Sequence, residues 1–311
     1  MTDGVSAAPL ALRTLVAGVV DYAGLFPPAS LDMAPASTNF AQYRASADAW
    51  MLGRFVLPVS RLDEWSAAVR ALDSSAQHAW HGARLSALLS GEFAHEAEQI
   101  SAFNDAQPFG VHIDTAEGRT GTPDTVLATA AAMPDDVMLY CELPHRSDPL
   151  ELLHAVKSAG VRAKIRTGGV TPDAFPAPHE IIRFLRRCVE TGVTAKATAG
   201  LHHPLRGEYR LTYVPGGLRG IMYGYLNVFL AAAALSIGAS DEMATAILLE
   251  QRAASFEMRE DAVVFAPDGV EQVTLLVPSI SAMRSGGLVA FGSCSFREPV
   301  QELGAIVSDV R

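Results

Sequence analysis

Short apolar stretches in the middle and at the end of this chain carry a polar, reactive side chain at every second position. Successive side chains of a strand point to opposite faces, so each stretch predicts a strand with one apolar and one ionisable face. The stretches are 109–114 with His112 and Asp114, 137–142 with Tyr140 and Glu142, 161–166 with Lys164 and Arg166, 193–198 with Lys196 and Thr198, and 288–295 with Ser293 and Ser295. The polar groups gather near the C-terminal end of each stretch.

Amphipathic helical segments alternate with these stretches, which is typical of a parallel sheet built from βαβ units. Three further apolar runs, at 19–22, 53–58 and 84–89, bring the predicted strands to eight. We therefore predict an α/β fold, a (β/α)8 TIM-type barrel, because only a closed sheet brings the ends of all these strands to one place. The predicted helices between the strands cover 37–47, 62–72, 92–104, 123–132, 148–158 and 178–190.

The spacing of these units is interrupted once, between the seventh and the eighth strand. Residues 201–287 contain helical patterns at 219–237, 240–250 and near 270–284, with an extended stretch at 256–265, where one helix would suffice. We predict a single barrel domain over 1–311, with 201–287 as a helical insertion over the C-terminal mouth. Such an insertion would serve as a lid or as the interface of a homo-oligomer.

Composition and charge limit the classes of partner that we expect for this chain. A net charge of −10 argues against nucleic acid, because binding to a phosphate backbone needs a basic face. The most apolar helical segment, 221–237, contains Asn227 and is shorter than the roughly 20 residues that span a bilayer, so we expect no membrane partner. Cys141, Cys188 and Cys294 are widely spaced and match no zinc pattern. Reduced thiols and no secretory leader together predict a cytoplasmic protein.

Two lysines on neighbouring predicted strands are the main candidates for chemistry. A lysine that faces the inside of a barrel is unusual, because desolvation and a nearby cation both favour the neutral amine. A neutral amine is the nucleophile that a Schiff base requires. We therefore expect Lys164 and Lys196 to lie within a few ångströms of each other, with Asp114 and Glu142 balancing their charge or moving protons. The alternative is a buried layer of ion pairs that does no chemistry.

Motifs on the last four predicted strands resemble those of deoxyribose-phosphate aldolase. Lys164-Ile-Arg-Thr-Gly168 is similar to the Lys-Thr-x-Thr-Gly stretch of its sixth strand, and Lys196-Ala-Thr-Ala-Gly200 resembles its strand-seven lysine followed by glycine. Phe291-Gly-Ser-Cys-Ser295 resembles its strand-eight Phe-Gly-x-Ser end, and Cys141-Glu142 its strand-five glutamate. The resemblance implies that Lys164 carries a Schiff base and that Lys196 activates it. It also implies a substrate phosphate held by Gly168, Gly169, Gly200, Gly292 and Ser293.

These observations favour a carbon–carbon lyase, of aldolase type, that acts on a small anionic carbonyl compound without a metal or cofactor. Arg166, His202 and His203 join the predicted substrate-binding residues, since all three follow or end strands at the mouth. A metal-dependent lyase or isomerase, with His202, His203, Asp114 and Glu142 as ligands, is a second hypothesis, although the lysines and Arg166 would repel a cation. A third is a non-catalytic barrel that binds an anionic metabolite.

Overall fold

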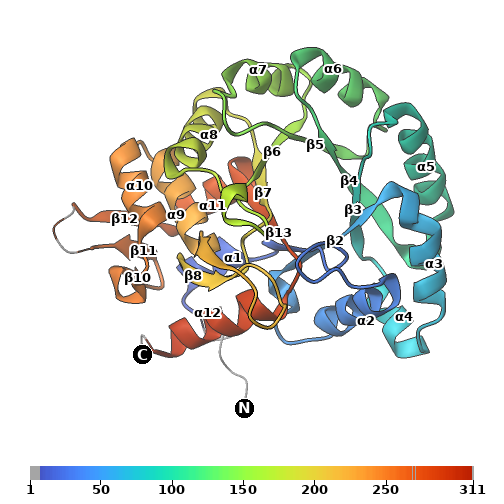
Figure 1. The fold of residues 1–311 in the computed structure, drawn as a ribbon, viewed down its shortest axis with the longest axis horizontal. Helices are drawn as coiled ribbons and strands as arrows, with labels where there is room; N and C mark the ends of the chain where they lie inside the picture. Colours follow the sequence, from blue (N-terminus) through green and yellow to red (C-terminus); the bar gives the residue numbers. More distant parts are fainter. Residues whose placement is uncertain (1–7, 268, 270, 310–311) are drawn as a thin grey trace.

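Eight parallel strands close into a barrel in the computed structural model, which describes residues 8–267, 269 and 271–309 (Figure 1). Their order around the barrel is β1-β13-β7-β6-β5-β4-β3-β2, so β13 closes the ring against β1. The predicted TIM-type barrel is thus confirmed. The strands are β1 (Val20–Tyr22), β2 (Leu52–Pro58), β3 (Arg84–Leu88), β4 (His112–Arg119), β5 (Met138–Glu142), β6 (Arg162–Arg166), β7 (Ala195–Thr198) and β13 (Leu288–Ser293).

Helices form the outer layer of the barrel and pack their apolar faces on the strands (Figure 1). In α8, for example, the buried side chains from Ile181 to Cys188 form one face, and the helix ends at Gly192 in the left-handed conformation that glycine tolerates best. The outer helices are α2 (Met33–Arg44), α3 (Leu62–Arg70), α4 (Ser74–Trp80), α5 (Phe93–Ala106), α6 (Pro123–Ala132), α7 (Leu150–Ser158) and α8 (Pro178–Thr191). Helix α1 (Leu10–Val16) precedes the first strand, and α12 (Arg297–Asp309) follows the last.

Residues 201–287 form several elements that differ from the predicted ones. The predicted helix at 219–237 is the strand β9 (Arg219–Met222) followed by α9 (Tyr225–Ser236), and β9 pairs with β8 (Gly207–Arg210) in a hairpin. After α10 (Asp241–Leu249) come β10 (Phe256–Met258), β11 (Ala262–Phe265) and β12 (Val273–Leu276), a small antiparallel sheet, and then α11 (Val277–Gly286).

The small sheet packs against α1, α9 and α11, beside the barrel and away from its mouth (Figure 1). The loop between β8 and β9 approaches the mouth, where the hydroxyl of Tyr213 donates to Glu298 and lies 3.6 Å from the sulfur of Cys294. The placement of most of this segment therefore differs from the expected insertion over the mouth. None of the described helices is both long and apolar enough to cross a bilayer.

The apolar core of the molecule lies mainly between the barrel wall and the helices, and it is rich in aromatic rings under α2 to α4. Trp80 contacts Phe40, Phe55 and Trp65, with ring centroids between 4.6 and 5.3 Å apart. The inside of the barrel, near its C-terminal end, contains a different set of side chains. They are ionic.

Candidate active site

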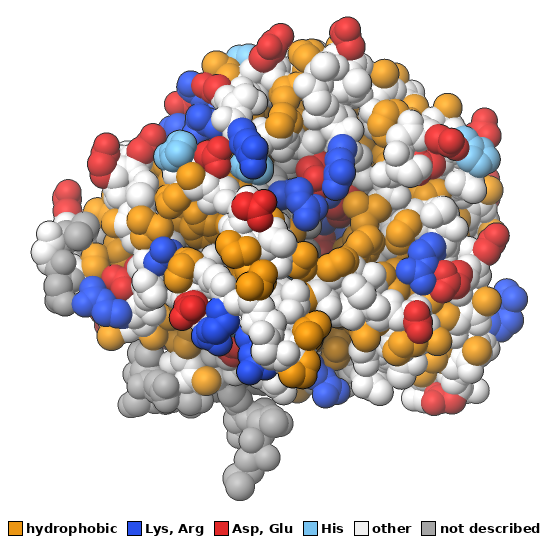
Figure 2. Space-filling model, in the orientation of Figure 1, with side chains coloured by type: hydrophobic (Ala, Val, Ile, Leu, Met, Phe, Trp, Pro, Cys, Tyr) orange, Lys and Arg blue, Asp and Glu red, His pale blue; other side chains and the backbone are white. Residues whose placement is uncertain are grey.

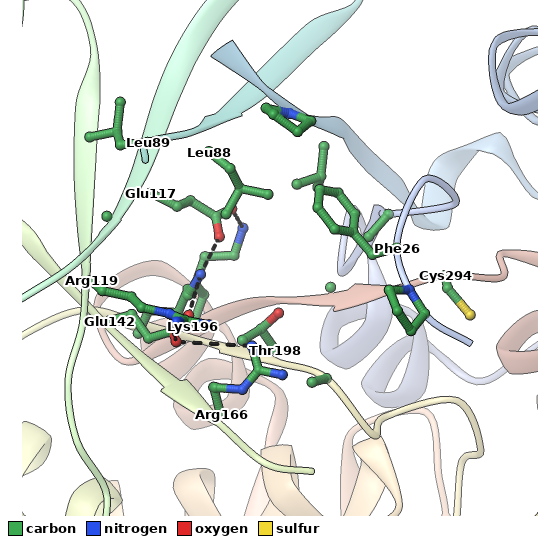
Figure 3. A pocket seen from close by; sticks show the side chains of 18 of the residues that line it. Phe26, Leu88, Leu89, Glu117, Arg119, Glu142, Arg166, Lys196, Thr198 and Cys294 are labelled. Carbon is green, nitrogen blue, oxygen red and sulfur yellow. Dashed lines mark hydrogen bonds and ion pairs between the residues drawn. The ribbon is translucent and has the colours of Figure 1, made fainter. Parts of the chain in front are cut away.

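A cavity of about 610 Å³ opens at the C-terminal mouth of the barrel. Figure 2 shows it as a hollow near the centre of this face, with charged side chains inside and hydrophobic side chains along one border. Lys196 and Glu117 lie deep in it, and Arg119, Glu142 and Arg166 lie along one side (Figure 3). Lys164, which is 2% exposed, also lines it. This is the position at which TIM-type barrels carry their active sites.

Five charged side chains form a continuous row across the inside of the barrel, and their charges alternate. Lys196 Nζ lies 2.5 Å from Asp21 Oδ2 and 2.6 Å from Glu117 Oε1. The other oxygen of Glu117 lies 2.8 Å from Lys164 Nζ, which is also 2.7 Å from Glu142 Oε2. We call Asp21, Lys196, Glu117, Lys164 and Glu142 the ionic row. All five residues lie on strands, on β1, β7, β4, β6 and β5 in the order of the row, and none lies on a loop. They face the inside of the barrel because alternate side chains of a strand point to the same face.

The electrostatics of the ionic row are set by mutual pairing inside a buried volume. Burial alone would favour the neutral amine of Lys196, but the carboxylates of Asp21 and Glu117 outweigh it and raise the pKa of Lys196 well above its ordinary value. Burial likewise opposes the charge of Glu117, but the two ammonium groups hold the pKa of Glu117 far below its usual range. Lys196 is therefore held as a cation, whereas from the sequence we expected desolvation and a nearby cation to favour its neutral amine. Glu117 separates the two lysines.

The outer end of the ionic row is less completely paired than its centre. Glu142 Oε1 lies 3.3 Å from Arg119 Nε and 3.9 Å from Arg166 Nη1, while its other oxygen contacts Lys164. One carboxylate thus serves three cations. The Arg119 side chain is 82% exposed and that of Arg166 is 43% exposed, so both guanidinium groups retain donors that face the open cavity.

The predicted site residues separate into two groups. Those that line the cavity are Lys164, Lys196, Glu142, Arg166, Gly169, Gly200, His202 and Gly292. Gly168 and Ser293 lie immediately behind this lining: a side chain on Gly168 would collide with Phe175, and Ser293 is buried with its hydroxyl 3.3 Å from His202 Nδ1. Close packing is enough to explain the glycines, so the implied phosphate site stays a prediction.

Asp114 was predicted as a catalytic residue, and the structure corrects this. Strand β4 runs from His112 to Arg119, five residues beyond its predicted end, and its pairing with β3 shifts at Asp114. Asp114 therefore lies toward the N-terminal end of the barrel, where it pairs with Arg54 and Arg84. Burial opposes its charge, but the hydrogen bonds from Arg54 outweigh burial and lower the pKa of Asp114. It is a structural anion.

His203, like Asp114, lies away from the cavity. Its ring stacks on Tyr209 with centroids 3.5 Å apart, and its Nδ1 lies 2.9 Å from Glu302. The metal hypothesis used His202 or His203 with Asp114 or Glu142, and of these only His202 and Glu142 line the cavity. Among the described residues, no three histidine, cysteine, aspartate or glutamate side chains are arranged to hold a metal ion.

Glu117 and Arg119 are the functional candidates that the sequence pattern did not identify. Both belong to the continuation of β4, where Thr115, Glu117 and Arg119 alternate with the small residues Ala116 and Gly118. That second alternating set is a detectable signal, but it is out of phase with His112 and Asp114 because of the irregularity between them. The predicted strand followed the first phase and stopped too early.

The chain contains only three lysines, Lys157, Lys164 and Lys196, against twenty-one arginines. Lys157 is exposed on α7 and donates to the carbonyl of Gly192. The other two line the cavity, where Lys164 is 2% exposed and Lys196 is 1% exposed. The chain therefore uses arginine for nearly all of its surface ion pairs and places two of its three primary side-chain amines at the floor of the mouth.

A neutral, buried imidazole lies in the wall of the cavity beside Cys294. His202 Nδ1 is 3.7 Å from Cys294 Sγ and 3.7 Å from Glu298 Oε2. Burial, with a smaller effect from the neighbouring His203, lowers the pKa of His202 from 6.5 to about 4. Burial raises the pKa of Cys294 to about 11, so this pair is an uncharged thiol beside an uncharged imidazole near neutral pH.

This burial predicts an acid-sensitive contribution to stability. The unfolded chain takes up a proton on His202 as the pH falls below about 6.5, whereas the folded protein resists protonation down to about pH 4. Stability should therefore be lost across this window, by about 2 kcal/mol at pH 4.5 from this residue.

Urea unfolding of wild type and His202→Asn at pH 7 and pH 4.5 measures this loss of stability. The variant should lose less stability on acidification, whereas His95→Asn, at an exposed position on α5, should match wild type. Equal pH dependence in His202→Asn and wild type would contradict the assignment.

No protein-family model and no curated protein matches this chain. Among solved structures, it is similar to the spore cortex-lytic enzyme SleL of Bacillus cereus, with a TM-score of 0.40 and 10% sequence identity. That match covers 94% of this chain and 74% of the SleL chain. A likeness of this degree says nothing about activity, and function has to be inferred from the site.

Proposed function

We propose that this protein is a carbon–carbon lyase that binds a small anionic carbonyl compound at the mouth of the barrel and forms a Schiff base with it through Lys164. The observation that carries the proposal is the place of Lys164 Nζ at the cavity floor, 2.8 Å from Glu117 and 2.7 Å from Glu142. Lys196 is the less suitable nucleophile, because Asp21 and Glu117 raise its pKa, whereas one of the two carboxylates beside Lys164, Glu142, is shared with Arg119 and Arg166. Lys164 stands one step nearer the exposed end of the ionic row.

Lys164 must lose a proton before it can attack a carbonyl carbon, and Glu142 is placed to accept it. Glu142 forms ion pairs with Arg119, Arg166 and Lys164. An anionic substrate that binds the two guanidinium groups takes over their positive charge and adds a negative charge beside Glu142. Both changes weaken the hold of the guanidinium groups on Glu142 and leave its oxygen free to take the proton of Lys164. Substrate binding would therefore prepare the neutral amine.

The neutral amine of Lys164 adds to the carbonyl carbon, and the resulting carbinolamine loses water when protonated Glu142 returns its proton to the departing hydroxyl. The iminium then draws electrons from the bond between the carbon next to it and the following, hydroxyl-bearing carbon. Glu142, again a carboxylate, takes the proton of that hydroxyl, the bond breaks, and the hydroxyl-bearing fragment leaves as a carbonyl compound while the other fragment stays on Lys164 as an enamine. Return of the proton to the enamine carbon and addition of water to the iminium release the second product and the amine of Lys164. Glu117, held ionised between two ammonium groups, would stabilise the positive charge of the iminium nitrogen.

Trapping with sodium borohydride tests this function, because reduction converts an iminium into a stable secondary amine but leaves an ion pair unchanged. We expect pyruvate, glyoxylate or glyceraldehyde 3-phosphate, incubated with the protein and borohydride, to add the reduced mass to the peptide that contains Lys164. Since the chain has three lysines, mass spectrometry can assign the adduct without ambiguity, and exposed Lys157 is the internal control for non-specific reaction. Modification of Lys157 alone, or of no lysine with any of the three probes, would exclude the Schiff-base mechanism for these compounds and favour a barrel that only binds anions.

A further inference from the structure

We propose that the natural ligand of the cavity is amphiphilic, with an anionic head at Arg119 and Arg166 and an apolar chain or ring of several carbons that lies against the opposite wall. This inference rests on the proposed anion site and extends it to the class of the substrate. It comes from the part of the cavity that the Schiff-base proposal does not use.

An apolar wall comes from the first three strands and the segments that follow them, and it extends round the cavity to Leu89 and Phe93, which lie against Gly118 beside Arg119. In Figure 3, Phe26 and Leu88 lie across the cavity from Arg119, Glu142 and Arg166. We call Phe26, Val56, Pro58, Leu88, Leu89 and Phe93 the apolar wall; all six line the cavity. Except for buried Val56, they are only partly buried, so apolar surface stays open to the cavity. An open apolar surface inside a cavity is stabilised when an apolar ligand covers it.

Glu96 lies in the cavity lining near the apolar wall but does not make that side an ionic site. It belongs to α5, and its carboxylate accepts hydrogen bonds from the backbone N–H groups of Ser90 and Gly91. It fixes the loop after β3. Ionic groups with open donors are therefore found at the guanidinium side, while the other side offers carbon surface. The two sides fit the two ends of an amphiphile.

The size of the cavity agrees with this division. A water molecule occupies roughly 30 Å³ in the liquid, so a carbonyl compound with six or seven heavy atoms would fill on the order of 200 Å³. The cavity of about 610 Å³ exceeds this several-fold and falls in the range that encloses much larger ligands. A small anion bound at Arg119 and Arg166 would leave the apolar wall in contact with water.

Calorimetric titration with straight-chain carboxylates tests the proposal on the full-length protein. We expect butanoate, hexanoate and octanoate to bind about three- to fourfold more tightly for each added methylene, the gain typical of burying one such group. Hexyl phosphate is the second head group, and hexanol, which lacks the charge, should bind at least tenfold more weakly than hexanoate. These probes contain no carbonyl carbon that an amine attacks readily, so the result is independent of imine formation at Lys164.

Two sets of variants separate the wall from the head group. Leu89→Gln and Phe93→Gln should flatten the dependence of affinity on chain length, because both side chains are partly buried in the lining and can be replaced without opening the core. Arg166→Gln should weaken all chain lengths by a similar factor. Leu127→Gln, on α6 and 45% exposed, is the control and should change neither. The proposal fails if wild-type affinity does not rise with chain length, or if Leu89→Gln and Phe93→Gln keep the wild-type dependence. If the dependence holds and borohydride traps nothing, the ligand class stands and the Schiff-base mechanism falls.

Discussion

Replacing Lys196 with methionine should destabilise the protein by about 3 to 5 kcal/mol, the effect typical of removing one partner from a buried ionic cluster. Lys196 is 1% exposed, and its ammonium group is the only side-chain cation within 4 Å of Asp21 among the described residues. Methionine preserves most of the apolar stem but leaves the Asp21 carboxylate buried without its charge partner. Urea unfolding at neutral pH measures the loss of free energy.

A second substitution should restore much of the stability that Lys196→Met loses. In the double variant Lys196→Met, Asp21→Asn, both charges of the pair are gone, and Glu117 keeps its ion pair with Lys164 and its hydrogen bond from Ser86. We expect much of the lost stability to return. Lys157→Met, at an exposed site, should lie within about 0.5 kcal/mol of wild type and serves as the matched control. A Lys196→Met protein as stable as the Lys157→Met protein would show that the ionic row is not a stabilising cluster.

Lys164→Arg should abolish borohydride trapping while keeping most of the stability of the fold. A guanidinium group preserves the positive charge between Glu117 and Glu142, but it stays protonated and forms no Schiff base under these conditions. Lys164→Met should also abolish trapping, and it should cost about 3 to 5 kcal/mol in addition, because two buried carboxylates lose a shared cation. Adduct formation per mole of folded protein is the measurement.

Comparison of these two variants distinguishes chemistry from packing. If Lys164 served only as an ion-pair partner, its replacement by arginine would alter neither ligand-dependent labelling nor the lysine that carries it. An adduct that persists in Lys164→Arg and maps to Lys196 would move the nucleophile to the neighbouring strand. An adduct that maps to Lys157 would remove it from the cavity.

The barrel could be predicted from the sequence because its strands and helices have the two periodicities that such folds require. The placement of Lys164, Lys196, Glu142 and Arg166 around one mouth followed from their positions near the ends of β5, β6 and β7. Parallel strands in a closed barrel align their ends, so local pattern was sufficient for these four residues.

The main error in the predicted site arose from the register of β4 with its neighbour β3. The irregularity of β4 at Asp114 changes which residues face inward, and a pattern of alternation cannot show where a strand takes up an extra residue. Glu117 was missed for this reason, and without Glu117 the two lysines looked like neighbouring cations in mutual repulsion. The hairpin β8–β9 was missed because Arg219 to Met222 precedes a very apolar helix and was read as its first turn.

The ionic row also has a consequence for how this barrel can change over generations. In an apolar core, one residue can be exchanged for another of similar volume at modest cost. In the ionic row each charge is balanced by an opposite charge on a different strand. A single neutral replacement therefore leaves a buried charge without its ion-pair partner. Tolerated changes at Asp21, Lys196 and Glu117 should therefore arise in compensating pairs, far apart along the chain and adjacent in space. Among sequences that share this barrel, we expect these positions to covary as a block, while residues of the apolar wall drift one at a time.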